Sequence, residues 1–109
     1  MERLEKARTF AETIIVNNSY LKDGIVELIT AMSLYSVEQK REYTDISFIV
    51  ETMENYKYFE MYSLFENLPK SSGAYLAFKI FQCNNKSNGE QVYNLAKCLC
   101  KIERENQYD

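Results

Sequence analysis

Three observations on this 109-residue sequence predict an all-α fold. Apolar side chains recur every three or four residues along most of the chain, which is the period of a helix that buries one face. Only three glycines and one proline are present, so the chain lacks the many turn residues of a β fold. An apolar fraction of 46% and a charged fraction of 27% are typical of a globular protein. We therefore expect a single domain, residues 1–109, folded as a compact bundle of about five helices.

The N-terminal third predicts two helices. The first is expected over residues 2–16, with one apolar face made by Leu4, Ala7, Ala11, Ile14 and Ile15. Asn17, Asn18 and Ser19 then favour a turn, and Ser19 is a candidate N-cap. The second helix is expected over residues 20–35, with apolar residues spaced four and three apart at Leu21, Ile25, Leu28, Met32 and Tyr35. Residues 36–39 fit a capping box, which would start a third helix at Val37.

The stretch over residues 45–68 is the most aromatic in the chain, and we expect it to lie at the centre of the domain. Asp45 or Thr44 is a candidate N-cap for a helix there. On one straight helix, Ile46 and Tyr58 would differ in direction by about 120°. Two interpretations follow: one long central helix over residues 45–68, buried on several sides, or a break near residues 55–57. A strand over residues 46–50 is a third, less favoured alternative.

The C-terminal third predicts two more helices. Pro69 ends the central element, and Ser71 or Ser72 caps the next helix, which buries Ala74, Ala77, Phe78 and Phe81. Residues 84–89 form a loop. The last helix is expected to bury Val92, Leu95, Ala96, Leu99 and Ile102, and the tail is expected to fray from about residue 105.

The composition argues against most kinds of catalysis. The absence of histidine removes Ser-His-Asp and Cys-His arrangements, and three scattered glycines cannot form a phosphate-binding loop. Cys98 and Cys100 would point about 200° apart on a helix, so they cannot hold one ion together. Together with Cys83 they are expected to be free, reduced thiols. We expect no enzyme, no cofactor and no metal.

The location expected from the sequence is cytoplasmic, without membrane attachment. No apolar run approaches the ~18 residues that a membrane span needs, and the charged N-terminus does not resemble a signal peptide. Abundant Tyr, Asn, Lys and Ile are typical of AT-rich genomes, including those of low-GC bacteria, their phages and other viruses.

Two charged surfaces and a group of tyrosines are candidate binding sites. Acidic residues on the central stretch predict a docking face made by Glu51, Glu54 and Glu60. Basic residues near the C-terminus predict a stripe for nucleic-acid phosphates, an acidic partner or a second copy, made by Lys97, Lys101 and Arg104. The simplest interpretation of both is a solvated helix surface. Nine tyrosines without tryptophan are a high load, and partner contacts are expected at Tyr56, Tyr58 and Tyr62.

These features favour a non-catalytic helical protein-interaction module. Such a protein would act as a regulator or inhibitor of a larger protein complex, as bacterial regulators, immunity proteins and phage or mobile-element inhibitors do. The sequence also allows self-association into a homo-oligomer. The alternative is a nucleic-acid-associated module that uses the basic C-terminal third, although a net charge of −3 disfavours it.

Overall fold

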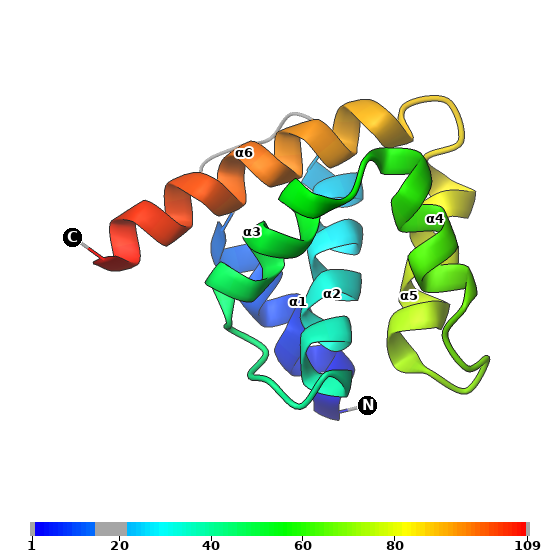
Figure 1. Ribbon diagram of the computed structural model, residues 1–109, viewed down its shortest axis with the longest axis horizontal. Coiled ribbons are helices and arrows are strands. Elements are labelled where there is room, and N and C mark those ends of the chain that lie inside the picture. Colours follow the sequence, from blue (N-terminus) through cyan, green and yellow to red (C-terminus); the bar gives the residue numbers. More distant parts are fainter. Residues whose placement is uncertain (1, 15–21, 109) are drawn as a thin grey trace.

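The computed structural model describes residues 2–14 and 22–108, and these residues form helices without any strand (Figure 1). The all-α prediction is confirmed, with six helices in the described ranges where about five were expected. They are α1 (Glu2–Ile14), α2 (Lys22–Glu38), α3 (Ile46–Asn55), α4 (Tyr58–Glu66), α5 (Gly73–Asn84) and α6 (Gly89–Tyr108). Ser19, the expected cap of the second helix, lies outside the described residues.

The central stretch is two short helices, so the interpretation with a break near residues 55–57 is confirmed and the alternative of one long helix over residues 45–68 is wrong. Asp45 caps α3 by accepting a hydrogen bond from the Phe48 N–H at 3.1 Å. The backbone then becomes extended at Tyr56 and Lys57, and the Glu60 carboxylate accepts from the Lys57 N–H at 2.7 Å to start α4. Because the chain breaks there, the apolar stripes of α3 and α4 both face the core.

The helix at the centre of the fold is α2, whereas we expected the stretch over residues 45–68 to lie there. Eleven of its seventeen residues are buried, and α1, α3, α5 and α6 all pack against it. The predicted capping box at residues 36–39 does not start a new helix, because α2 continues through it to Glu38. Instead, Ser33 and Ser36 donate from their hydroxyls to the carbonyls of Tyr43 and Glu42, each at 2.7 Å. These bonds fasten the loop before α3 to α2.

Two helices flank α2 on either side of one face. α1 packs through Ala7, Phe10 and Ala11. α5 begins at the predicted Ser72 cap, whose hydroxyl accepts from the Tyr75 N–H at 3.0 Å, and it buries the four expected residues Ala74, Ala77, Phe78 and Phe81. The packing of α5 on α2 is the most extensive between any two helices described, and α1 on α2 comes next.

Aromatic rings join α4 to the rest of the core. The rings of Phe65 and Phe78 stack with their centroids 4.2 Å apart and their planes nearly parallel. Tyr62 meets Phe78 edge-on, and Tyr35 of α2 lies 5.5 Å from Phe65. Much of the aromatic load of the sequence is therefore used to hold α4 against α5 and α2.

The long helix α6 crosses the ends of α2 and α3, and its C-terminal part extends beyond the body of the molecule (Figure 1). It buries Val92 and Ala96, as predicted, together with Tyr93 and Cys100. Ile102 was expected in the core but is 54% exposed, because the buried face is centred one residue away from the predicted stripe. The helix extends to Tyr108, and the expected fraying from about residue 105 stays a prediction.

Candidate functional site

The three tyrosines proposed for partner contacts differ in their environments. Tyr58 is buried, Tyr62 is half-buried and Tyr56 is exposed. The hydroxyls of Tyr58 and Tyr62 share a hydrogen bond of 3.0 Å, and their rings meet edge-on. Burial, followed by that hydrogen bond, raises the pKa of Tyr58 well above its usual range. Tyr58 therefore packs inside the fold, and only Tyr56 and the edge of Tyr62 face solvent.

The three glutamates predicted to form the acidic docking face are all exposed, but two of them have partners within the chain. Glu60 caps α4 through the Lys57 N–H. Glu54 forms an ion pair with Lys101 at 3.1 Å and lies 3.9 Å from Arg104. Glu51 is exposed on α3. The predicted acidic docking face is thus partly occupied by contacts of this same chain.

The basic stripe on α6 is occupied in the same way. Lys101 and Arg104 face Glu54 of α3, so the acidic stretch that they meet is their own. Lys97 lies over the ring of Tyr93, 5.1 Å from its centroid. The contacts with Glu54 join α6 to α3, and all of these contacts leave less of the stripe for nucleic-acid phosphates.

The cysteines do not come together. Cys83 and Cys98 are exposed, and Cys100 is buried in α6. Burial, with a smaller effect of Glu103, raises the pKa of Cys100 to about 12, which makes its thiol unreactive. Across residues 2–14 and 22–108, no three cysteine or carboxylate side chains are grouped so as to hold a metal ion. No helix within those ranges is both long and apolar enough to cross a membrane.

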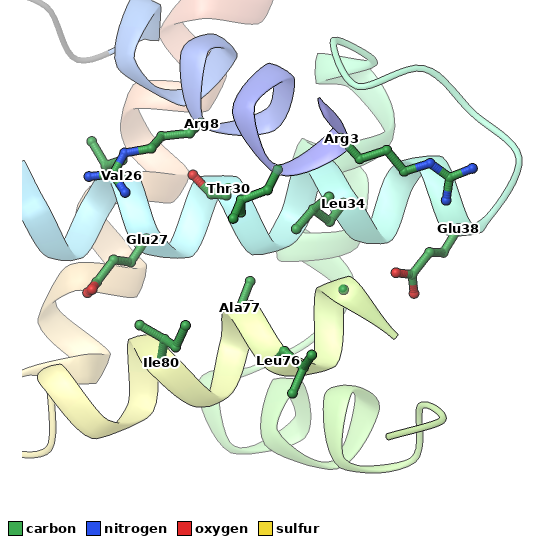
Figure 2. A pocket seen from close by; sticks show the side chains of 12 residues that line it. Arg3, Arg8, Val26, Glu27, Thr30, Leu34, Glu38, Leu76, Ala77 and Ile80 are labelled. Atoms are coloured by element: carbon green, nitrogen blue, oxygen red, sulfur yellow. The ribbon is translucent and has the colours of Figure 1, made fainter. Parts of the chain in front are cut away.

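A concave surface lies elsewhere, in a groove that the sequence analysis did not predict. It runs between α1 and α5 and has a volume of about 450 Å³ (Figure 2). We call it the α1/α5 groove. Its floor is the side of α2 that lies between α1 and α5, with the buried residues Val26, Thr30 and Leu34. Its walls carry Arg3, Leu4 and Arg8 from α1, and Gly73, Leu76, Ala77 and Ile80 from α5.

The walls of the α1/α5 groove expose large apolar side chains. Leu4 is 45% exposed, Leu76 53% and Ile80 56%. These are three of the six large hydrophobic residues that are exposed in the described parts of the chain, and all three line one groove. Exposed apolar side chains gathered in one concave place are typical of a binding site, whereas scattered ones are not.

The two rims of the groove carry opposite charges. Arg3 and Arg8 stand on the α1 rim, and Glu27 and Glu38 stand on the rim next to α5. Arg8 and Glu27 lie at one end of the groove, and Arg3 and Glu38 lie at the other (Figure 2). None of the ion pairs found among the described residues joins the two rims.

The two glutamates of the rim are held in place by α5. The Glu38 carboxylate accepts hydrogen bonds from the Ser72 hydroxyl and the Ala74 N–H at the start of that helix. The Glu27 carboxylate accepts from the side-chain amides of Asn84 and Asn85 at its end. Eleven residues separate the two glutamates, which is close to three helical turns, so both lie on one face of α2. They fix α5 along α2 and thereby fix the position of the α5 wall of the groove.

One polar atom of the floor is unusual. Thr30 is only 5% exposed, and its hydroxyl has no hydrogen-bond partner among the described residues. A buried hydroxyl without a partner costs free energy, so such groups are rare in folded proteins. The groove therefore combines an apolar lining, charged rims and one unsatisfied hydroxyl beneath it.

Sequence reasoning missed the groove because its residues come from three separate segments. The only local signal was an apolar pair, Leu76 and Ile80, four residues apart on α5 and outside the predicted core face. Two apolar stripes on one short helix indicate two contact surfaces. Comparison with protein-family models, with curated proteins and with solved structures finds no match to this chain.

Proposed function

We propose that this chain is a non-catalytic protein-interaction module and that the α1/α5 groove is its contact surface. The observation that carries the proposal is the gathering of Leu4, Leu76 and Ile80, each about half exposed, around one apolar groove with charged rims. In water such side chains favour contact with another apolar surface, and the rims supply orientation. Bound to a larger complex, the module would act as a regulator or inhibitor by occupying the surface that it covers.

Other features support binding over chemistry. The strongly raised pKa values belong to groups placed inside the helical core: Tyr58, whose pKa lies well above its usual range, Cys100 at about 12 and Tyr93 at about 12. None of the three lines the groove. The nucleic-acid alternative is weakened because Lys101 and Arg104 already face Glu54. The same proposal includes a cytoplasmic site of action, on the grounds of the free thiols. It also includes a phage or mobile-element origin, because abundant Tyr, Asn, Lys and Ile are typical of proteins from AT-rich genomes.

The test compares two single substitutions that are matched in chemistry and exposure. Ile80→Asp changes a groove residue that is 56% exposed, and Ile102→Asp changes a residue of α6 that is 54% exposed and outside the groove. Tagged wild-type chain and both variants are used to capture proteins from the native host, and the captured proteins are quantified. We expect specific partners to be retained by wild type and Ile102→Asp and lost from Ile80→Asp, at least tenfold in amount. A captured set that Ile80→Asp leaves unchanged would contradict the proposal.

A further inference from the structure

We propose that the α1/α5 groove binds a second copy of this chain, giving a twofold-symmetric dimer. The inference rests on the proposed function, that this groove binds protein, and it names one partner. A twofold interface brings the same patch of each copy together, so the patch must be complementary to itself. The groove meets this condition in both charge and apolar surface, whereas a surface of one charge would repel its own copy.

The arrangement of charges selects one orientation of the twofold axis. An axis parallel to the groove places α1 of each copy over α5 of the other and keeps corresponding ends together. Arg3 of one copy then faces Glu38 of the second, and Arg8 faces Glu27, because each arginine shares an end of the groove with that glutamate (Figure 2). Both pairings occur twice in the dimer. With an axis perpendicular to the groove, each arginine would instead face the opposite copy's arginine rim.

The same orientation covers the exposed apolar side chains. Leu4 projects from the α1 wall, and Leu76 and Ile80 belong to the α5 wall. When α1 of one copy lies over α5 of the other, Leu4 covers the Leu76/Ile80 pair on both sides of the axis. Three side chains that are about half exposed in one copy thereby become buried in two copies.

The carboxylates of Glu27 and Glu38 are already oriented and can each accept further hydrogen bonds from an arginine of the second copy. Each oxygen of Glu27 and Glu38 already accepts one hydrogen bond from α5, and a carboxylate has about four acceptor positions in total. Acceptor capacity therefore remains for a guanidinium. Because α5 already fixes both carboxylates, their ordering costs little on association. Arg3 and Arg8 are exposed and have no ion-pair partner among the described residues.

The first test is the mass of the chain in solution across a concentration series. For the wild-type chain we expect the mass to rise with concentration from 12.9 kDa toward twice that value, with a dissociation constant in the micromolar range, because the patch is small. Sedimentation or light scattering measures this directly. A wild-type chain that stays monomeric at every concentration, or that forms larger assemblies without a dimer, would overturn the inference.

Charge reversal on α1 tests the proposed pairing. Arg3→Glu with Arg8→Glu places like charges against Glu38 and Glu27, so we expect the dissociation constant to rise at least tenfold while the thermal unfolding midpoint is unchanged. The control is Lys70→Glu with Lys86→Glu, an equal change of charge at two exposed residues outside the groove. A mixture of wild type with the α1 variant should dimerise with intermediate affinity, because one rim keeps its pairs. Equal weakening by both double variants, or by neither, would overturn the proposed pairing.

An apolar variant keeps the inference testable if the charge variant loses its fold. Ile80→Asp should weaken the dimer about tenfold, and Ile102→Asp should not. The outcomes also separate the two proposals. A monomeric chain whose capture of host proteins depends on Ile80 contradicts the dimer but keeps the proposed function. If Ile80→Asp weakens the dimer but leaves the capture of host proteins unchanged, the dimer is supported and the proposed function is contradicted.

Discussion

Thr30 and Thr52 show how one hydrogen bond distinguishes two residues of the same type and nearly equal burial. Thr30 is 5% exposed and its hydroxyl has no partner among the described residues. Thr52 is 6% exposed and donates to the Phe48 carbonyl at 2.8 Å. Both are on helices, where a valine occupies nearly the same volume. The difference between them is therefore the satisfied or unsatisfied hydroxyl.

We expect Thr30→Val to leave stability unchanged or to raise it by about 1 kcal/mol, because it removes a buried hydroxyl that has nothing to bond. Thr52→Val, the matched control, should lower stability by about 1 kcal/mol, since it removes a made bond. Urea unfolding followed by circular dichroism measures both. A Thr30→Val variant that loses as much stability as Thr52→Val would show that the Thr30 hydroxyl is satisfied in solution.

Residue-scale predictions from sequence succeeded where the physics is local. The caps Asp45 and Ser72 were each one of two adjacent candidates, because an N-cap depends only on a short polar side chain and the next three residues. Whether the Ile102 side chain is buried or exposed depends instead on how α6 is rotated about its axis against α3 and α2. That rotation is set by Tyr93, which fills the core and donates to the carbonyls of Met53 and Tyr56 at 2.7 and 2.5 Å.

At the scale of helices, two glycines lie where α2 packs against a neighbouring helix, Gly24 in α2 and Gly73 at the start of α5, and only the first is required by close packing. A Cβ added at Gly24 would meet the Asn85 side chain and would lie 3.2 Å from a methyl group of Val92. Asn85 cannot swing away cheaply, because its amide donates to Glu27 and to the Phe81 carbonyl. At Gly73 the nearest atoms, from Glu38 and Leu34, are 3.7 and 3.9 Å away, which is ordinary contact.

Gly24→Ala should therefore destabilise the fold by about 1–3 kcal/mol, because overpacking outweighs the gain in helix propensity of about 1 kcal/mol. Gly73→Ala should be neutral or stabilising by up to ~1 kcal/mol. Thermal unfolding of the two variants beside wild type decides between these signs. If both variants gained stability, the close packing of α2 against Asn85 and α6 would be disproved.

The hydrogen bonds from the start of α5 to the Glu38 carboxylate of α2, which we call the Glu38 clamp, are expected to stabilise the fold. Glu38→Ala removes the acceptor of the Ser72 hydroxyl and the Ala74 N–H, so we expect a loss of about 2 kcal/mol. Glu51→Ala is the control, since Glu51 is an exposed carboxylate on α3, and its effect should lie within about 0.5 kcal/mol. Equal effects in denaturant unfolding would mean that the clamp contributes nothing to stability.

The sequence predicted helices more reliably than their limits. Apolar periodicity identified α1, α2, α5 and α6 because apolar side chains recur every three or four residues along each of them. It left open a break between α3 and α4, which depends on the Glu60 carboxylate turning back to the Lys57 N–H. The capping-box pattern suggested a helix start at Val37, capped by Ser36, but α2 continues there and the Ser36 hydroxyl donates to the loop. Polar side chains with several available partners are decided by tertiary contacts, which a single sequence does not reveal.

At the scale of the whole molecule, the α1/α5 groove follows from the arrangement of three helices. α1 and α5 both pack on α2, and small residues such as Ala7, Ala11 and Ala77 allow them close to it. Their outer side chains, Leu4, Leu76 and Ile80, are then left beside one another across the groove. No local sequence pattern predicts that these three side chains lie together. The charged surfaces that the sequence did predict, on α3 and α6, instead contact each other, because Glu54 faces Lys101 and Arg104.

The most direct test of the α1/α5 groove as a protein-contact surface is residue-resolved nuclear magnetic resonance. Amide and methyl signals of the isotope-labelled chain are recorded from dilute to concentrated solution, and again after addition of any captured partner. We predict concentration-dependent shifts at Leu4, Leu76 and Ile80, with little change at Tyr56 or along Lys97–Arg104. Constant groove signals, with shifts confined to those other two surfaces, would contradict the account.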